Sequence, residues 1–198
     1  MNAIRFTDFS LVSMIYKNKA FFDRKVNRIR TDFDFKKDVS VYCYHSFKEL
    51  ECSIHVHIPK WVTGASDGNN IHLLLSNNIN NSNELDYMKI ILHEFTHVAL
   101  YHYSRTLIPF WLDEGIALFY AGQIEREYDR DIVVDNNLSE LTYSDCYYLF
   151  MKVIEKFSFE FVIAHIKEVA DFSSDDILGE ENIKKILNEY MANEKRKI

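Results

Sequence analysis

The sequence predicts an α+β fold, in which a small mixed sheet with an exposed edge strand precedes a helical part. Short runs of β-forming residues fall between positions 39 and 75, whereas helical spacing of apolar residues dominates after position 83. The chain has 198 residues, with 47% hydrophobic and 27% charged residues but only 5 Gly and 2 Pro, which excludes disordered and collagen-like proteins. We therefore expect one domain over 1–198, made of a basic helical segment (1–38), a β-rich part (39–82) and a helical part (83–198).

The basic segment, residues 1–38, contains 9 Lys and Arg against 5 Asp and Glu, a net charge of +4. The remaining 160 residues have a net charge of −11, which gives −7 for the whole chain. Its apolar residues between Phe6 and Phe33 recur at helical spacing, which predicts an amphipathic helix with a basic outer face. Three roles stay open: packing on the acidic remainder, contact with a nucleic acid or protein partner, and inhibitory cover over a cleft. Because no run of cations exceeds two residues, we expect no nucleic-acid partner.

The β-rich part contains two predicted strands rich in β-forming residues, Val39–Tyr44 and Ser53–Ile58. Gly64–Asn70 is typical of a turn, Ile71–Leu75 of another short strand, and 77–83 of a polar loop.

The helical part begins at Asn83, which can cap the first helix together with Asp86. The apolar pattern predicts four further helices, beginning near Asp113, near Thr142 or Ser144, near Phe159 and near Glu180.

The first of these helices contains the pattern His93-Glu94-Phe95-Thr96-His97. Two histidines four residues apart lie on one face of a helix, about one turn from each other, so both imidazoles can reach one tetrahedral metal ion. Glu94 lies about 100° around the helix, where it can contact a water on that ion. In a chain of this composition the pattern arises by chance about 0.02 times, so a further ligand is needed to support it.

The third ligand is predicted to be Glu114, in the run Trp111-Leu112-Asp113-Glu114-Gly115. The 16 residues between His97 and Glu114 suffice to end one helix, turn, and begin another that presents a carboxylate to the first. A His₂Glu site with one open position is the arrangement of catalytic zinc, which lowers the pKa of a bound water toward about 7. Trp111 and Leu112 are expected to be core residues.

The two motifs together resemble the gluzincin zinc metallopeptidases of the peptidase MA-like type, whose signature is HExxH followed by WLxEGxA. The resemblance implies that His93, His97 and Glu114 bind one Zn²⁺ per chain and that Glu94 is the general base. It further implies that a tyrosine near the start of the next helix, here Tyr143, donates to the oxyanion.

The same resemblance implies that the strand before the zinc helix is the sheet edge that receives an extended substrate, which assigns substrate binding to Ile71 and Leu73. Packing is an open alternative for Tyr143, because the chain has 12 Tyr, with Tyr147 and Tyr148 one turn further on and Tyr120 on the predicted Glu114 helix.

Two departures from the family pattern refine the expected activity. Aminopeptidases of this type use a Glu in a Gly-x-Met-Glu-Asn motif to hold the substrate amine, whereas Gly64–Asn70 contains no Glu, and Asp67 could replace it only with a shifted backbone. This difference favours an endopeptidase or a specialised processing peptidase. Leu118 replaces an Asp that orients a zinc histidine in thermolysin-like members, so another group must supply that contact.

The sequence thus predicts zinc-dependent hydrolysis of peptide bonds by a metal-activated water, with a peptide or protein as substrate. A further possibility is a peptidase that cleaves one particular protein, which would have the same mechanism and differ only in its substrate. The alternative is a catalytically silent zinc-binding domain, with a regulatory or partner-binding role, derived from such a peptidase.

The absence of a signal peptide or an apolar run of about 18 residues predicts a cytoplasmic protein without a membrane partner. The three cysteines, Cys43, Cys52 and Cys146, form no Cys-x-x-Cys pair and are expected to be buried or half-buried free thiols.

The other six histidines are not expected to be metal ligands. His72 and His102 are predicted to face solvent or a groove, and four more show no metal spacing with the motif: His45, His55, His57 and His165.

Overall fold

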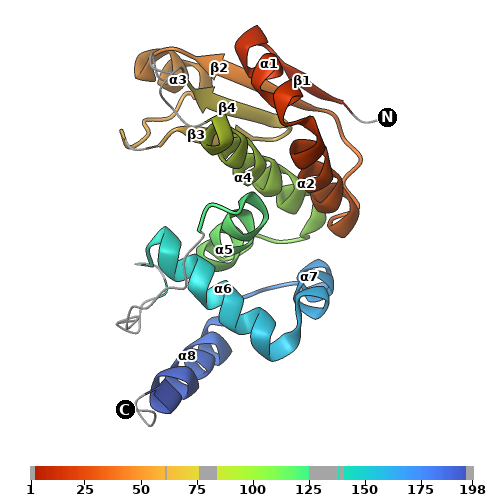
Figure 1. The fold of residues 1–198 in the computed structure, drawn as a ribbon. Helices are drawn as coiled ribbons and strands as arrows, with labels where there is room; N and C mark the ends of the chain where they lie inside the picture. Colours follow the sequence, from red (N-terminus) through yellow and green to blue (C-terminus); the bar gives the residue numbers. More distant parts are fainter. Residues whose placement is uncertain (1–2, 61, 76–83, 125–137, 139–140, 195–198) are drawn as a thin grey trace. The chain divides into compact units, whose positions relative to one another are not determined.

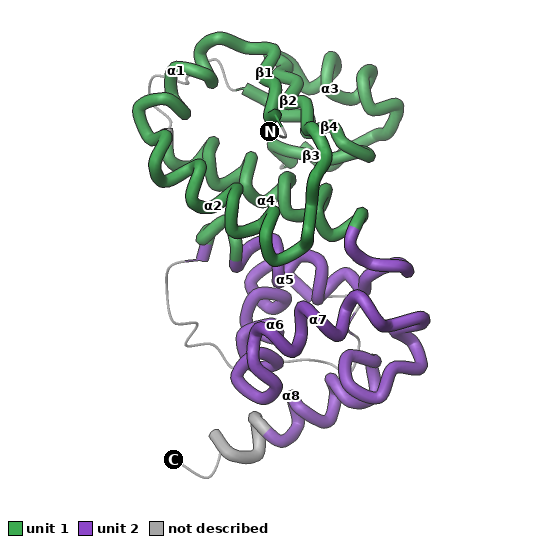
Figure 2. The backbone as a smooth tube through the Cα atoms, turned by 90° about the vertical axis from the view of Figure 1, so that its right-hand side faces the viewer, with its two compact units in different colours: residues 1–102, 120–123 green, residues 103–119, 124–198 purple. Residues whose placement is uncertain are grey.

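The computed structural model describes residues 3–60, 62–75, 84–124, 138 and 141–194. The chain folds into two compact units, residues 1–102 with 120–123 and residues 103–119 with 124–198 (Figure 2). The predicted α+β class is confirmed, because the described residues combine helices with a four-stranded mixed sheet. The single-domain organisation stays a prediction. Among these described residues, no helix is both long enough and apolar enough to cross a membrane.

The sheet belongs to the first unit and has the strand order β1 (Ile4–Phe6), β2 (Val39–Tyr44), β4 (Asn70–Leu74), β3 (Gly64–Asp67). β2 pairs in parallel with β1 and β4, and β3 pairs antiparallel with β4 (Figure 1). The predicted strand Val39–Tyr44 is confirmed. The strand predicted at Ile71–Leu75 is also present, but its predicted place at the edge is wrong, because β4 lies between β2 and β3.

Ile71 and Leu73 are therefore wrong as substrate-binding residues. Both are fully buried and lie across from Val41 and Cys43 of β2, on the face of the sheet that contributes to the core. The edge strand beside β4 is β3, within the segment predicted to be a turn. Gly64–Asp67 contains few β-forming residues, and it is a strand because it pairs with β4 through a tight turn at Gly68, where φ is +50°.

The strand predicted at Ser53–Ile58 is wrong, since α3 (Phe47–Ile54) covers its beginning and the rest is irregular. The helix begins at Ser46, whose Oγ accepts the Glu49 N–H at 3.3 Å, while the Glu49 carboxylate accepts the His45 N–H at 3.1 Å. It ends at His55, which has a left-handed φ of 57°. Local capping thus outweighs the β propensity of the residues that follow.

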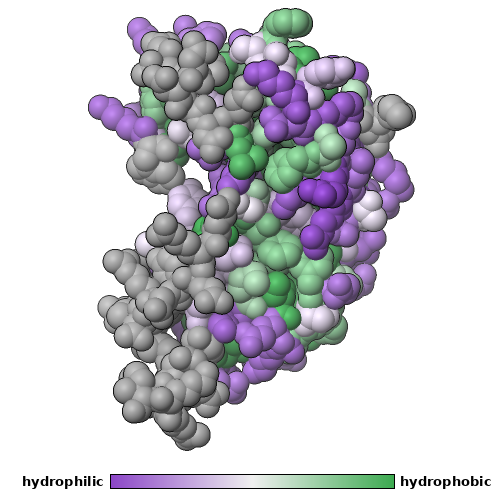
Figure 3. All heavy atoms as spheres, in the orientation of Figure 1, coloured by the Kyte–Doolittle hydropathy of each residue, from purple (hydrophilic) through white to green (hydrophobic). Residues whose placement is uncertain are grey.

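The basic segment forms β1 and two helices, α1 (Phe9–Lys17) and α2 (Lys19–Asp32), instead of one continuous helix. The chain breaks at Asn18, whose N–H caps the end of α1 at the Ile15 carbonyl, 3.1 Å away. α2 buries Phe22, Val26 and Ile29, and the face drawn in Figure 3 shows hydrophilic side chains gathered over it. Residues 3–38 therefore pack into the first unit and contribute a strand to its sheet.

The remaining helices mostly begin where the sequence predicts: α4 (Glu84–Tyr103), α5 (Phe110–Ala121), α6 (Tyr143–Phe157), α7 (Phe159–Glu168) and α8 (Glu180–Glu194). α5 begins three residues before the predicted Asp113, because the Pro109 carbonyl accepts the N–H groups of Leu112 and Asp113 at 2.9 and 3.0 Å. The predicted cap at Asn83 and the loop 77–83 lie outside the described residues.

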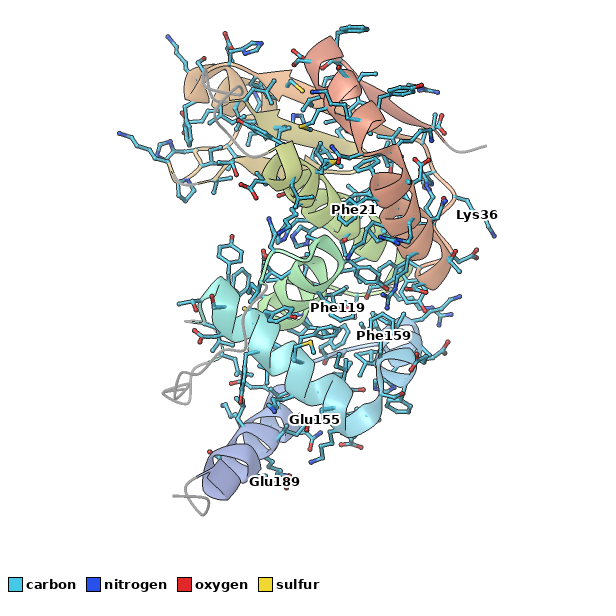
Figure 4. The ribbon with its side chains drawn as sticks, in the orientation of Figure 1. Phe21, Lys36, Phe119, Glu155, Phe159 and Glu189 are labelled. Atoms are coloured by element: carbon cyan, nitrogen blue, oxygen red, sulfur yellow. The ribbon has the colours of Figure 1, made fainter. Side chains whose placement is uncertain are left out.

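Two contacts organise the second unit. Thr142 forms a capping box with Asp145 at the start of α6. The Phe119 ring of α5 lies 5.3 Å from that of Phe159 on α7, and Figure 4 labels both residues. These contacts fix the helices that follow α5 by local capping and by aromatic packing.

His72 of β4 is buried, with 4% of its surface exposed, so the predicted solvent or groove position is wrong. Its imidazole stacks on the rings of Tyr42 and Tyr44, with centroids 5.6 and 5.8 Å away. Nδ1 lies 2.8 Å from the Tyr44 hydroxyl, which also lies 2.6 Å from Ser53 Oγ, and Nε2 lies 3.5 Å from the Asp67 carboxylate. Burial lowers the pKa of His72 below its usual 6.5, and the attraction of Asp67 opposes this shift.

A His72→Gln substitution should therefore reduce the loss of stability on acidification. The fold favours neutral His72, so the stability that it contributes is present above pH 6.5 and is lost as pH falls through that value toward the lowered pKa. The measurement is the free energy of urea unfolding between pH 5 and 8, on metal-free protein. His45→Gln, at an exposed histidine, is the control. Equal slopes in wild type and His72→Gln would contradict the prediction.

Candidate metal centre

The two histidines of the HExxH pattern project from α4 as predicted. Their Nε2 atoms lie 3.0 Å apart, and the ring planes meet at 77° with centroids 4.7 Å apart. Two zinc–nitrogen bonds of about 2.0–2.1 Å at a tetrahedral angle would separate these nitrogens by about 3.3–3.4 Å. The pair is therefore close to the spacing that a shared metal ion requires.

The residues between the histidines anchor this helix in the core. Phe95 is fully buried and meets the Phe35 ring edge-on at 5.7 Å, and the Arg30 guanidinium lies over it at 5.2 Å. The Thr96 hydroxyl donates to the Leu92 carbonyl at 2.7 Å, so this buried polar group is satisfied within the helix. These contacts fix the rotation of α4, and with it the direction of both imidazoles.

Glu114 lies in the second turn of α5, a helix held by the buried residues Trp111 and Leu112. The core role predicted for these two residues is confirmed. A Cβ added at Gly115 would lie 2.6 Å from the Cys146 carbonyl oxygen and 2.7 Å from Phe150 Cβ. Residue 115 must therefore be a glycine for α5 and α6 to approach so closely, which gives a physical reason for the Glu-Gly sequence.

One ligand atom from each of His93, His97 and Glu114 lies within 4.8 Å of the others. All three side chains are buried or half-buried, and together they could hold a metal ion. The sequence thus identifies a ligand set that the structure brings together. Two imidazoles and a carboxylate suit zinc better than calcium or magnesium, which prefer sites made of oxygen ligands.

Comparisons with protein-family models, curated proteins and solved structures give no match to this chain. Its function is therefore inferred from the side chains themselves.

Glu94, the predicted general base, is 8% exposed and lies next to β3. A Cβ added at Gly64 would be 3.0 Å from Glu94 Oε1 and 3.1 Å from Glu94 Cγ. The carboxylate is therefore held between α4 and the edge strand of the sheet.

Tyr143 is the first residue of α6 and is 37% exposed. Its ring lies 6.1 Å from that of Phe110, which is one turn before Glu114 on α5. Tyr120 is a packing residue, because it is buried and its hydroxyl donates to Asp32 at 2.6 Å. The oxyanion role of Tyr143 stays a prediction.

His102 and the three cysteines lie outside the group that could hold a metal ion. His102 is exposed and its Nε2 lies 2.6 Å from Asn69 Oδ1. Burial raises the pKa of Cys146 to about 12, with smaller contributions from Glu114 and Asp145, so its thiol stays protonated at neutral pH. Cys43 is half-buried as expected, whereas Cys52 is exposed.

The outer edge of β3 was not predicted from the sequence. The Leu74 N–H donates to the Thr63 carbonyl at 2.9 Å. In an antiparallel pair every second residue directs its N–H and C=O groups to the partner strand, so those of residues 63, 65 and 67 face β4. The N–H and C=O groups of Gly64 and Ser66 are directed to the opposite side, where no described strand pairs with them. The sequence signal for this hairpin is the two-residue loop Gly68-Asn69, between Asp67 of β3 and Asn70 of β4.

Proposed function

We propose that this chain is a zinc-dependent peptidase that hydrolyses internal bonds of extended peptides. The observation that carries the proposal is the convergence of His93, His97 and Glu114, because these are the ligands that the HExxH and WLDEG motifs predict independently. The buried Glu94 between the first two ligands adds an acid–base group that a purely structural metal site does not need.

His93, His97 and Glu114 would hold the ion, with a fourth position left for water or substrate. A bound zinc ion supplies Lewis acidity, which polarises a carbonyl and lowers the pKa of water toward about 7.

The proton transfers belong to Glu94. Its carboxylate accepts a proton from the attacking water as the hydroxyl forms a bond to the carbonyl carbon of the substrate. It then delivers that proton to the amine nitrogen as the carbon–nitrogen bond breaks, so one water is added across the peptide bond. Tyr143 is proposed to donate a hydrogen bond to the carbonyl oxygen as negative charge develops there.

Substrate binding is proposed at the outer edge of β3, in place of β4. An extended peptide would pair with the outward-directed groups of Gly64 and Ser66, beside the Glu94 carboxylate. Main-chain pairing of this kind is largely independent of side chains. Asp67 is exposed and lies against His72, and the chain has no Glu between Gly64 and Asn70 to hold a free amine, which favours internal cleavage.

Removing the metal should abolish hydrolysis, and one equivalent of zinc should restore it. The substrate is a quenched fluorescent peptide blocked at both ends by acetylation and amidation, and metal content is measured by mass spectrometry. Magnesium added to the metal-free protein should not restore cleavage, because this ion requires octahedral oxygen coordination. One tightly bound zinc without cleavage of casein or any blocked peptide would instead favour the silent zinc-binding domain.

A further inference from the structure

At residue 64 the edge strand packs tightly against α4. An ideal Cβ at this position would lie 2.7 Å from Ile90 Cγ2, 3.0 Å from Glu94 Oε1 and 3.1 Å from Glu94 Cγ. Contacts below 3.0 Å are not sustained by real Cβ atoms, so even a methyl group would force Ile90 or the strand to shift.

The space for Glu94 to move is limited on the helix side as well. Glu94 is 8% exposed, and its neighbours Leu92 and Phe95 are fully buried, so α4 cannot rotate without disturbing the core. An added methyl group at residue 64 would therefore press on Glu94 as well as on Ile90, and at 3.0 to 3.1 Å the Glu94 side chain would have to shift by a few tenths of an ångström.

We propose that Gly64 is a positioning residue, whose missing side chain sets where the Glu94 carboxylate lies. The same absence lets the Gly64 main chain, directed to the outer edge, lie directly beside that carboxylate. The inference rests on the proposed role of Glu94 as the base. It adds that β3 contacts the base directly, so a substitution in β3 alters proton transfer by Glu94 while the three metal ligands stay unchanged.

The test is Gly64→Ala in the zinc-loaded, full-length chain. We expect kcat to fall by about 10- to 100-fold, because a displacement below 1 Å at a reacting group costs rates of this order, with KM and the zinc content nearly unchanged. Ala65→Ser is the matched control: it adds one heavy atom on the neighbouring residue, which faces the other side of the sheet.

A second variant separates the two neighbours of residue 64. Ile90→Ala removes the Cγ2 atom that lies 2.7 Å from an added Cβ, so in this background the two Glu94 atoms remain of its three nearest neighbours. The fall in kcat should persist there. If it disappears, or if kcat is unchanged in both backgrounds, the proposal is overturned. This double variant also answers the question if Gly64→Ala alone does not fold.

A readout independent of activity is the ¹³Cδ resonance of Glu94 at fixed pH, assigned by comparison with Glu94→Gln. It should move in Gly64→Ala and stay in place in Ala65→Ser, and an unmoved resonance would overturn the proposal. If the wild-type chain cleaves nothing, the peptidase function fails, whereas this spectroscopic result still decides whether Gly64 positions Glu94.

Discussion

Glu94→Gln should reduce peptide hydrolysis by about 10²- to 10⁴-fold while one zinc ion per chain remains bound. The amide retains the size and shape of the carboxylate but has a donating NH2 in place of one oxygen and cannot accept the proton of water. Glu94 is not among the three clustered ligands, so its replacement leaves their donor atoms intact. The measurements are the initial rate on the blocked peptide and the zinc content of the same sample.

The matched control for this variant is Glu49→Gln, at an exposed carboxylate that caps α3 far along the chain. It should retain full activity, apart from the small stability loss of a weakened cap, about 1 kcal/mol. Wild-type rates in a zinc-loaded Glu94→Gln protein would show that Glu94 is not the base. Loss of the zinc together with the activity would assign Glu94 a role in holding the ion.

Glu114→Ala should weaken zinc binding by at least about 100-fold and abolish hydrolysis. Loss of a group that merely orients a ligand already costs about 10- to 100-fold in metal affinity, and loss of a ligand should cost no less. His97→Ala should have a similar effect, because it also leaves two of the three protein ligands. Competition with a chromophoric chelator measures the affinity of each variant.

Asp113→Asn is the control for Glu114, since it changes the neighbouring carboxylate on the same helix and lies outside the clustered ligands. Its zinc affinity should stay within a few-fold of the wild type. Full zinc occupancy in Glu114→Ala at chelator concentrations that wild type resists would contradict the ligand assignment.

The part of the site that the sequence predicts is the part encoded by local geometry. His93 and His97 share a helix face because four residues are close to one turn, and this spacing allows their Nε2 atoms to lie 3.0 Å apart. Glu114 is not local, and only the two motifs in their order indicated that α5 would present it to the histidines. The structure adds a packing reason for that motif, since Gly115 lets α5 contact α6 at the backbone.

The wrong predictions from the sequence concern strands whose pairing partners are distant in the chain, and segments where a helix signal and a strand signal overlap. Residues 64–67 form a strand because they pair with β4. β4 lies inside the sheet because its other side pairs in parallel with β2, which is distant in the sequence. At α3, the Ser46-x-x-Glu49 cap begins a helix that runs into the β-forming residues from Ser53 onward, so two local signals overlap there. His72 is buried because aromatic residues of β2 stack on it, which periodicity does not reveal.

The short length of β3 also limits the pairing that its open edge offers to another copy of the chain. An open sheet edge is a template on which another copy of the chain can add strands, and proteins counter this with short or charged edge strands. β3 offers only two residues with outward-directed main-chain groups, Gly64 and Ser66, and it ends at the exposed carboxylate of Asp67. Such an edge is a poor template for the addition of strands from another copy.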